Sequence, residues 1–302
     1  MTTLDSFLRW LEEEAKDEKT VAAYKTAVSQ FCKWYIDSTG SEDLNSVKPS
    51  DVKEYLRYLK HTMNRKQATI NKATASLKTF FSYLTELGSI NDNPMTRIKI
   101  QKVQLSNNVG EKSVIKWLTK EEQDKFIDHV NFEKNELKRI RNLAIVDVML
   151  YSGLRVAEVE ALKVEDINVN GDITITIREG KRGRYSSVTM IQKYSKNLRN
   201  WLKLRNALDD EIYLHSPYLF VSERSGQLRT RGIQVMLNKY AASASMDNIF
   251  PHRFRHSFCK NLANAGVSIE TICKLARHES IQTTAIYIDP SHHELLRALE
   301  RM

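Results

Sequence analysis

The chain has 302 residues, a length that suits about two domains, each large enough to bury its own core. Its 46 Lys and Arg residues outnumber 37 Asp and Glu, and the formal net charge of +9 favours a polyanionic partner, either nucleic acid or a membrane surface. No apolar run is long enough to span a membrane, and the N-terminus, MTTLDSFLRWLEEEAK, is acidic and amphipathic rather than a signal sequence. The three cysteines form no CxxC pair, so we expect a reducing compartment and neither a disulfide framework nor a cysteine-rich zinc site.

The first hundred residues show helical periodicity and no convincing strand. Apolar residues recur at spacings of three and four in four stretches: TLDSFLRWLEEEA, TVAAYKTAVSQFCKWYI, PSDVKEYLRYLKHT and QATINKATASLKTFFSYLTEL. We therefore predict an N-terminal helical bundle over residues 1–98. Basic and aromatic residues interleave in KHTMNRKQATINKATASLKTFF, a pattern that suits either contact with a sugar-phosphate backbone or an ordinary solvated helix face.

A polar and basic stretch without helical period, IKIQKVQLSNNVGEKSV, predicts an exposed linker at residues 99–115. The second domain is predicted over residues 116–302. It begins with two helical patterns, LTKEEQDKFIDHV and the strongly apolar RIRNLAIVDVMLYSG, which Gly153 ends. DITITIREGKRGRYSSVTMI then predicts a β-hairpin with a basic turn, and most of the remainder is again helical. The predicted fold class is mainly α with a small β-sheet.

The stretch PHRFRHSF, residues 251–258, concentrates cationic side chains. Pro251 suits the first position of a helix, which would place His252 and Arg255 on one face. Arginine offers a planar fork for two phosphate oxygens, and histidine can carry a proton near neutral pH. Taken alone, the stretch also fits a basic surface helix whose cations face water.

Four separated stretches together resemble the signature of the tyrosine recombinases, the phage integrase family of site-specific DNA recombinases. They are SGLRVAEVEAL (152–162), EGKRGRYSSV (179–188), PHRFRHSF (251–258) and LARHESIQTTAIYIDP (275–290). The resemblance extends over the second domain in order, and the layout is similar to that of Xer-like and transposon resolvase-like members. It assigns functional positions to Arg155, Glu158, Lys181, His252, Arg255, His278 and Tyr287.

The resemblance implies that Tyr287 is the nucleophile. A tyrosine hydroxyl, with a usual pKa of about 10, attacks poorly unless its proton is removed and its neighbours favour the phenolate. The attack would displace a 5′-hydroxyl and leave a 3′-phosphotyrosine link, which a second hydroxyl can reverse on a new strand. Arg155, Arg255 and His278 would stabilise the negative charge that develops on the phosphate.

The other assigned residues have supporting roles in the same resemblance. Lys181 would donate a proton to the leaving oxygen, His252 would hold phosphate and assist proton transfer, and Glu158 would orient the cationic cluster. No cofactor, ATP or divalent metal is expected. Consistent with this expectation, the sequence has no GxxxxGK[ST] loop, EF-hand loop or HExxH motif.

Several assignments have structural alternatives. Arg155 could simply pair with the acid three residues further on, and Lys181 lies in a basic turn that could be merely solvated. His278 could cap a helix and Tyr287 could be a core aromatic, although the functional role is favoured for both. For His256, in contrast, we favour the interpretation as a buried structural histidine.

The resemblance also implies an architecture and a set of partners. The N-terminal SAM-like bundle and the catalytic domain would form a C-shaped clamp on double-stranded DNA with inverted-repeat core sites. The segment HHELLRALERM after Tyr287 is amphipathic, and in relatives such a tail docks into a neighbouring subunit. We therefore expect a homotetramer with C-terminal helix exchange; the alternative is a helix folded back on its own domain. Accessory proteins could take part, no membrane partner is expected, and the expected location is the bacterial cytoplasm, with the nucleoid.

The function predicted from these observations is site-specific DNA recombination, for integration, excision or resolution of DNA elements. One alternative is an architectural or regulatory DNA-binding protein on the same fold, although simple binding needs no tyrosine at the phosphate. The other is an enzyme similar to a type IB topoisomerase or a telomere resolvase. That enzyme would share the phosphotyrosine step, so only the topology of its products would distinguish it.

Overall fold

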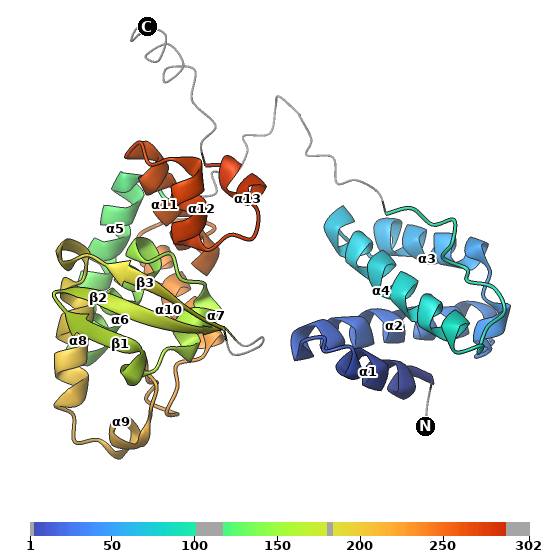
Figure 1. Cartoon of the computed structure of the whole chain (residues 1–302), viewed down its shortest axis with the longest axis horizontal. Helices are drawn as coiled ribbons and strands as arrows, with labels where there is room; N and C mark the ends of the chain where they lie inside the picture. Colours follow the sequence, from blue (N-terminus) through green and yellow to red (C-terminus); the bar gives the residue numbers. More distant parts are fainter. Residues whose placement is uncertain (1–2, 101–116, 180–183, 288–302) are drawn as a thin grey trace, which may run out of the picture. The chain divides into compact units, whose positions relative to one another are not determined.

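The computed structural model describes residues 3–100, 117–179 and 184–287. The chain divides into two compact units, Met1–Glu111 and Lys112–Met302 (Figure 1). The described residues are mostly helical with one small sheet, so the predicted fold class is confirmed. None of the described helices is long and apolar enough to cross a membrane.

The described part of the N-terminal unit is a helical bundle. Its helices are α1 (Thr3–Glu13), α2 (Glu18–Thr39), α3 (Pro49–His61) and α4 (Gln67–Glu86), with a short 3₁₀ turn, η1 (Leu44–Ser46). The side chain of Asp17 caps α2 by accepting a hydrogen bond from the Thr20 amide, and Gly40 ends the helix in the left-handed conformation. The largest buried side chains are aromatic and pack edge to face in the core: Phe7, Phe31, Tyr55, Phe80 and Phe81.

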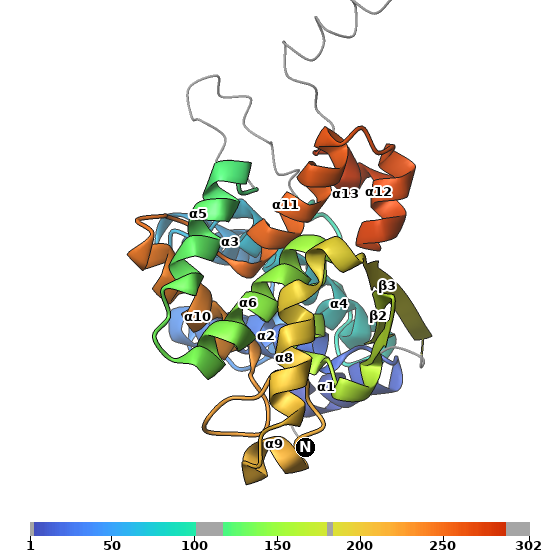
Figure 2. The ribbon, with the colours of Figure 1, turned by 90° about the vertical axis from the view of Figure 1, so that its left-hand side faces the viewer.

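The second unit, which we call the C-terminal unit, is built from nine described α-helices and a small sheet. In chain order they are α5 (Lys120–Asn131), α6 (Glu136–Tyr151), α7 (Val156–Ala161), α8 (Lys196–Asn206), α9 (Glu211–His215), α10 (Thr230–Ser243), α11 (Pro251–Asn264), α12 (Ile269–Ala276) and α13 (Ile281–Ala285). Two 3₁₀ turns, η2 (Val164–Asp166) and η3 (Gln192–Tyr194), flank the sheet. Helix α6 lies between α5 and α8 (Figure 2) and is buried continuously from residue 141 to residue 150.

The sheet has three antiparallel strands in the order β1 (Ile167–Asn170), β2 (Asp172–Glu179) and β3 (Arg184–Met190). The predicted hairpin corresponds to β2 and β3, which pair from Ile173 opposite Met190 to Glu179 opposite Arg184. Strand β1 was not expected from the sequence. It forms because Gly171, at a φ of 71°, allows a tight turn that folds the preceding residues back onto β2.

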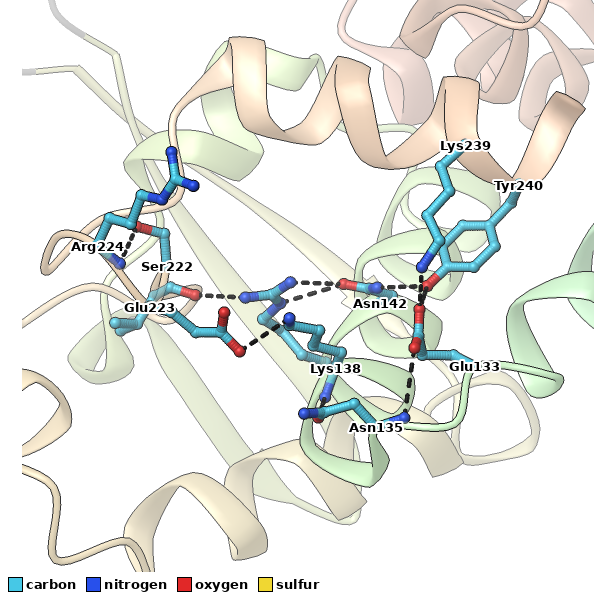
Figure 3. Close-up of polar contacts among 11 residues, drawn as sticks. Glu133, Asn135, Lys138, Asn142, Ser222, Glu223, Arg224, Lys239 and Tyr240 are labelled. Carbon is cyan, nitrogen blue, oxygen red and sulfur yellow. Dashed lines mark hydrogen bonds and ion pairs between the residues drawn. The ribbon is translucent and has the colours of Figure 1, made fainter.

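A polar network joins the α5–α6 junction to α10 (Figure 3). The Nδ2 atom of Asn142 donates a hydrogen bond to the Tyr240 hydroxyl over 2.9 Å, and that hydroxyl donates to Glu133 Oε2 over 2.8 Å. Buried Arg141 donates to Asn142 Oδ1 and, over 2.8 Å, to the Val221 carbonyl. Because these buried polar groups are hydrogen-bonded, the network can fix the relative positions of its helices without a large desolvation cost.

Candidate active site

Arg155 lies at the start of α7, where the chain leaves Gly153. Its backbone amide donates to Glu158 Oε2 over 2.7 Å, and its Nη1 atom donates to Glu158 Oε1 over 2.9 Å. The pair between Arg155 and Glu158, which was the structural alternative for Arg155, is therefore present in the fold. The pair does not cover the guanidinium, because the Arg155 side chain is 41% exposed and keeps donors for a further ligand.

Arg255 lies one turn inside α11, which begins at Pro251 as the sequence predicts. Arg255 is only 4% exposed, and its guanidinium donates hydrogen bonds to the Gly153 carbonyl over 2.5 Å and to the Ala276 carbonyl. Burial, followed by the nearby positive charge of Arg155, lowers the pKa of Arg255 to about 10. Arg255 thus connects the SGLR turn, α11 and the end of α12.

Gly153 makes this connection possible. It has a φ of 63°, in the region that only glycine adopts without strain, and an added Cβ atom would lie 2.4 Å from Cδ1 of Phe258 on α11. The close approach of the backbone to α11 brings the Gly153 carbonyl within reach of Arg255.

The two assigned histidines lie beside the two arginines. His252 is on the exposed side of α11, and its pKa is lowered by partial burial and then by the charges of Arg255 and Arg155. His278 follows α12, and the same causes lower its pKa to about 4. Its Nδ1 atom is 2.8 Å from the Thr284 hydroxyl on α13, which holds the ring in place. Both imidazoles are therefore neutral near pH 7 in the absence of an anion.

Tyr287 follows α13 and is 1% exposed. Its ring packs with Cys259, Ile272 and Ala276 in a small apolar cluster, and it stacks on the His278 ring with the centroids 6.3 Å apart. Burial raises the pKa of the Tyr287 hydroxyl, and the charge of Arg255 opposes that rise. Such burial is also what a core aromatic would show, but the stacking on His278 places the phenol beside the cationic cluster.

His256, interpreted from the sequence as a structural histidine, contacts the tyrosine that the resemblance assigns as nucleophile. It is half-buried, and its Nδ1 atom is hydrogen-bonded to the Tyr287 hydroxyl. The spacing of four residues between His252 and His256 was a usable signal, because it places both rings on one face of α11, with centroids 6.3 Å apart.

Three predicted features lie outside the described residues. Lys181 is one of residues 180–183, although the strands β2 and β3 on either side of them are described. Most of the predicted linker and the amphipathic C-terminal tail lie in residues 101–116 and 288–302. Among the described residues, no group of three or more His, Cys, Asp or Glu side chains has the arrangement of a metal site.

The N-terminal unit carries a basic groove of about 390 Å³, formed by α3, α4 and the segment that follows Met95. It overlaps the interleaved stretch KHTMNRKQATINKATASLKTFF identified in the sequence. Its charged or titratable lining residues are Lys53, Arg57, Lys60, His61, Arg97 and Lys99. A groove with this lining favours an anionic ligand.

A helical bundle, a helical domain with a small antiparallel sheet, and a cluster of arginine, histidine and tyrosine together define the class of the tyrosine recombinases. A sequence model of the phage integrase family matches residues 116–294, and one of the N-terminal SAM-like domain of phage integrases matches residues 4–88. The chain belongs to the phage integrase family. The predicted family is therefore confirmed, and with it the enzyme class, which cleaves and rejoins DNA strands.

Relatives of both predicted layouts are similar to this chain over nearly its whole length. The TnP I resolvase of Bacillus thuringiensis is 28% identical over 306 residues, covering 99% of each chain. The tyrosine recombinase XerC of Roseiflexus sp. (strain RS-1) is also 28% identical, covering 96% of this chain and 89% of the relative.

Solved structures share the fold at lower identity. XerH bound to palindromic difH substrate, a post-cleavage complex, aligns with a TM-score of 0.73 at 20% identity, covering 92% of this chain and 78% of that one. The Tn1549 transposon integrase in complex with circular intermediate DNA aligns with a TM-score of 0.70 at 22% identity, covering 99% of each chain.

Proposed function

We propose that this protein recombines DNA at specific sites by using Tyr287 as the nucleophile. The observation that carries the proposal is the meeting of three separated segments, residues 153–158, α11 and residues 276–287, around the end of α12. Arg255 contacts the carbonyls of Gly153 and Ala276, while His278 lies against Tyr287. Two arginines and two neutral histidines beside a buried tyrosine suit a phosphodiester better than a neutral substrate.

In the proposed cleavage step the Tyr287 oxygen forms a bond to phosphorus and the bond from phosphorus to the 5′-oxygen breaks. The phenol proton passes to a base, and Lys181 donates a proton to the departing 5′-oxygen. Arg155 and Arg255 stabilise the extra negative charge on the phosphate oxygens, so the protein supplies the cations that the step requires. The reverse reaction with a new 5′-hydroxyl joins the second strand and frees Tyr287.

His252 and Glu158 have supporting roles in this proposal. His252 is on the same face of α11 as Arg255, so it can donate to the same phosphate once that anion raises its pKa. Glu158 fixes one edge of the Arg155 guanidinium through the 2.9 Å contact between Oε1 and Nη1. Neither residue needs to bond to the DNA covalently.

We also propose that the DNA is double-stranded with inverted-repeat core sites. The structure of XerH on palindromic substrate and that of a lambda integrase dimer on a core site support this for a chain of the same fold. Synapsis of two such sites suggests a homotetramer with C-terminal helix exchange, working in a bacterial cytoplasm, with or without accessory proteins. The basic groove in the N-terminal unit supports a second contact to the DNA backbone.

Covalent trapping tests the proposal. Nicked duplexes made from the DNA that flanks the gene are incubated with the full chain in the presence of a chelator and then separated on denaturing gels. We expect a DNA-linked band with the wild type and with Tyr213→Phe, which removes another buried hydroxyl of the same unit, but not with Tyr287→Phe. A band that persists with Tyr287→Phe would show that another residue is the nucleophile.

The same assay separates the alternative functions. Specific DNA binding without any covalent band in the wild type would favour the architectural protein. A covalent band accompanied only by relaxed or hairpin-ended products would favour the topoisomerase-like or telomere resolvase-like enzyme. Exchange of flanking sequences between two duplexes is the product expected of a recombinase.

A further inference from the structure

Arg277, the residue between α12 and His278, has an unusual backbone conformation. Its φ of 54° and ψ of 50° place it in the left-handed region, and its amide donates to the Lys274 carbonyl at the end of the helix. Glycine normally occupies this position because a Cβ atom is disfavoured there. Among the described residues, the other non-glycine positions with positive φ are all exposed: Ala15, Asn64, Ser245 and Asn248.

The side chain of Arg277 instead points into the site. It is 11% exposed, and its Nη2 atom is 2.5 Å from Glu158 Oε2. Glu158, itself 16% exposed, uses its other oxygen to accept the 2.9 Å hydrogen bond from Arg155. One carboxylate therefore bridges two arginines that are 122 residues apart in the sequence.

The backbone of the same turn holds the two arginines of the proposed site. The Arg277 carbonyl accepts a hydrogen bond from Arg155 Nη2 over 3.3 Å, and the preceding carbonyl, of Ala276, accepts from Arg255. The carbonyl end of a helix carries partial negative charge, which suits two guanidinium groups. A left-handed residue that contacts Arg155 both directly and through Glu158 is a strained position at a functional site.

We propose that Arg277 is a positioning residue for Arg155, an inference that rests on the proposed role of Arg155 at the phosphate. The Oε2 atom of Glu158 also accepts from the Arg155 backbone amide, and by pairing with this atom Arg277 holds it away from the Arg155 guanidinium. The carboxylate therefore does not bind that guanidinium as a bidentate pair. Arg155 is then held at one edge by Glu158 and at another by the Arg277 carbonyl, and its remaining donors stay available for the phosphate. Without the Arg277 side chain, both carboxylate oxygens of Glu158 bind the Arg155 guanidinium.

The test measures single-turnover cleavage of the nicked duplex by the full chain at saturating DNA, together with DNA affinity and thermal unfolding. Arg277→Gly removes the guanidinium and suits the left-handed backbone, so the fold is retained. We expect cleavage to slow by about tenfold to a hundredfold, because a small misplacement of a group at the reacting centre is costly. DNA affinity is expected to change by less than about threefold, since the Arg277 side chain is only 11% exposed and is paired with Glu158.

Two further variants identify the route of the effect. Arg277→Lys keeps a positive charge facing Glu158 and is expected to recover part of the lost rate. Adding Glu158→Gln to Arg277→Gly is expected to cause no further loss and to restore some rate, because a neutral amide does not capture Arg155. Asn248→Gly, a glycine substitution at an exposed left-handed position of the same unit, is the control and should cleave as the wild type does.

Wild-type cleavage by Arg277→Gly, or a rate loss that merely follows a loss of folding or of DNA affinity, would overturn the inference. Additive losses in the double variant would also overturn it, because they would mean that Arg277 acts independently of Glu158. Failure of the proposed function is a separate outcome, since the wild type itself would then form no covalent band.

Discussion

The Tyr287 hydroxyl and the His256 Nδ1 atom are hydrogen-bonded to each other, while Tyr287 as a whole is only 1% exposed. The two residues are 31 apart in the sequence: His256 is on α11 and Tyr287 follows α13. The hydroxyl therefore has a ring nitrogen as its partner in an environment that raises the tyrosine pKa. A buried phenol with a raised pKa needs a base in contact with it before it can attack phosphorus.

We expect His256→Ala to slow DNA cleavage by about a hundredfold, because it removes the acceptor for the phenol proton. His129→Ala is a matched control. The Nδ1 atom of His129, on α5, also contacts a hydroxyl, Ser243 Oγ, over 3.0 Å, but His129 does not contact Tyr287. Single-turnover rates of the wild type and both variants at one pH provide the measurement. Faster cleavage by His256→Ala would instead mean that His256 restrains the tyrosine.

Binding of DNA should be accompanied by proton uptake at His278. Its pKa is lowered to about 4 by partial burial and by the charges of Arg255 and Arg155. A phosphate among the arginines offsets those charges and raises the pKa, so we expect uptake of up to about one proton at a pH of about 5.5, and almost none at about pH 8. Calorimetric titrations in buffers of different ionisation enthalpy measure this number. Equal uptake by His278→Gln would rule out His278 as the source.

Asp147, on buried helix α6, should make the C-terminal unit less stable as the pH rises. Burial, opposed by a hydrogen bond from Asn197, raises its pKa from 3.8 to about 7. The folded state then holds a proton that the unfolded state has lost, so stability is fully present below about pH 4 and decreases up to about pH 7. Each unit of pKa shift corresponds to about 1.4 kcal/mol. We expect Asp147→Asn to raise the free energy of unfolding by about 2 kcal/mol at about pH 8, which is less than the full shift because the structure relaxes around the charged carboxylate.

Thermal unfolding followed between about pH 5 and pH 8 checks this expectation. The wild type should lose stability across the range, and Asp147→Asn should show a flatter dependence. Asp124→Asn removes an exposed carboxylate that pairs with Lys120 on α5, and it should leave the pH dependence unchanged. A parallel decline in wild type and Asp147→Asn would show that other groups cause it.

Local sequence patterns predicted the features that depend on near neighbours. The start of α11 at Pro251 and the pair between Arg155 and Glu158 follow from spacing and cap preferences, and both are present. Strand β1 was missed although its four residues, INVN, alternate apolar and polar side chains. The run is short, and two of its residues are asparagine, a type that is depleted in strands.

Contacts between distant segments could not be predicted in this way. The pair between Arg277 and Glu158 joins residues that are 119 apart in the sequence. The left-handed conformation of Arg277 was also not predictable, because glycine or asparagine usually indicates that conformation and arginine does not. The role assigned to His256 depends on where the chain after α13 returns to α11, which local periodicity does not specify.

Gly153 has no functional group, yet its surroundings leave little space for any other residue. Its carbonyl receives a hydrogen bond from Arg255, and an alanine Cβ would collide with Phe258 on the helix that carries His252 and His256. In a genetic selection for cells that have lost recombination, substitutions at Gly153 would be recovered alongside those of the charged residues. A map of mutational tolerance would therefore mark as essential a residue without a side chain, and only the backbone geometry would explain why.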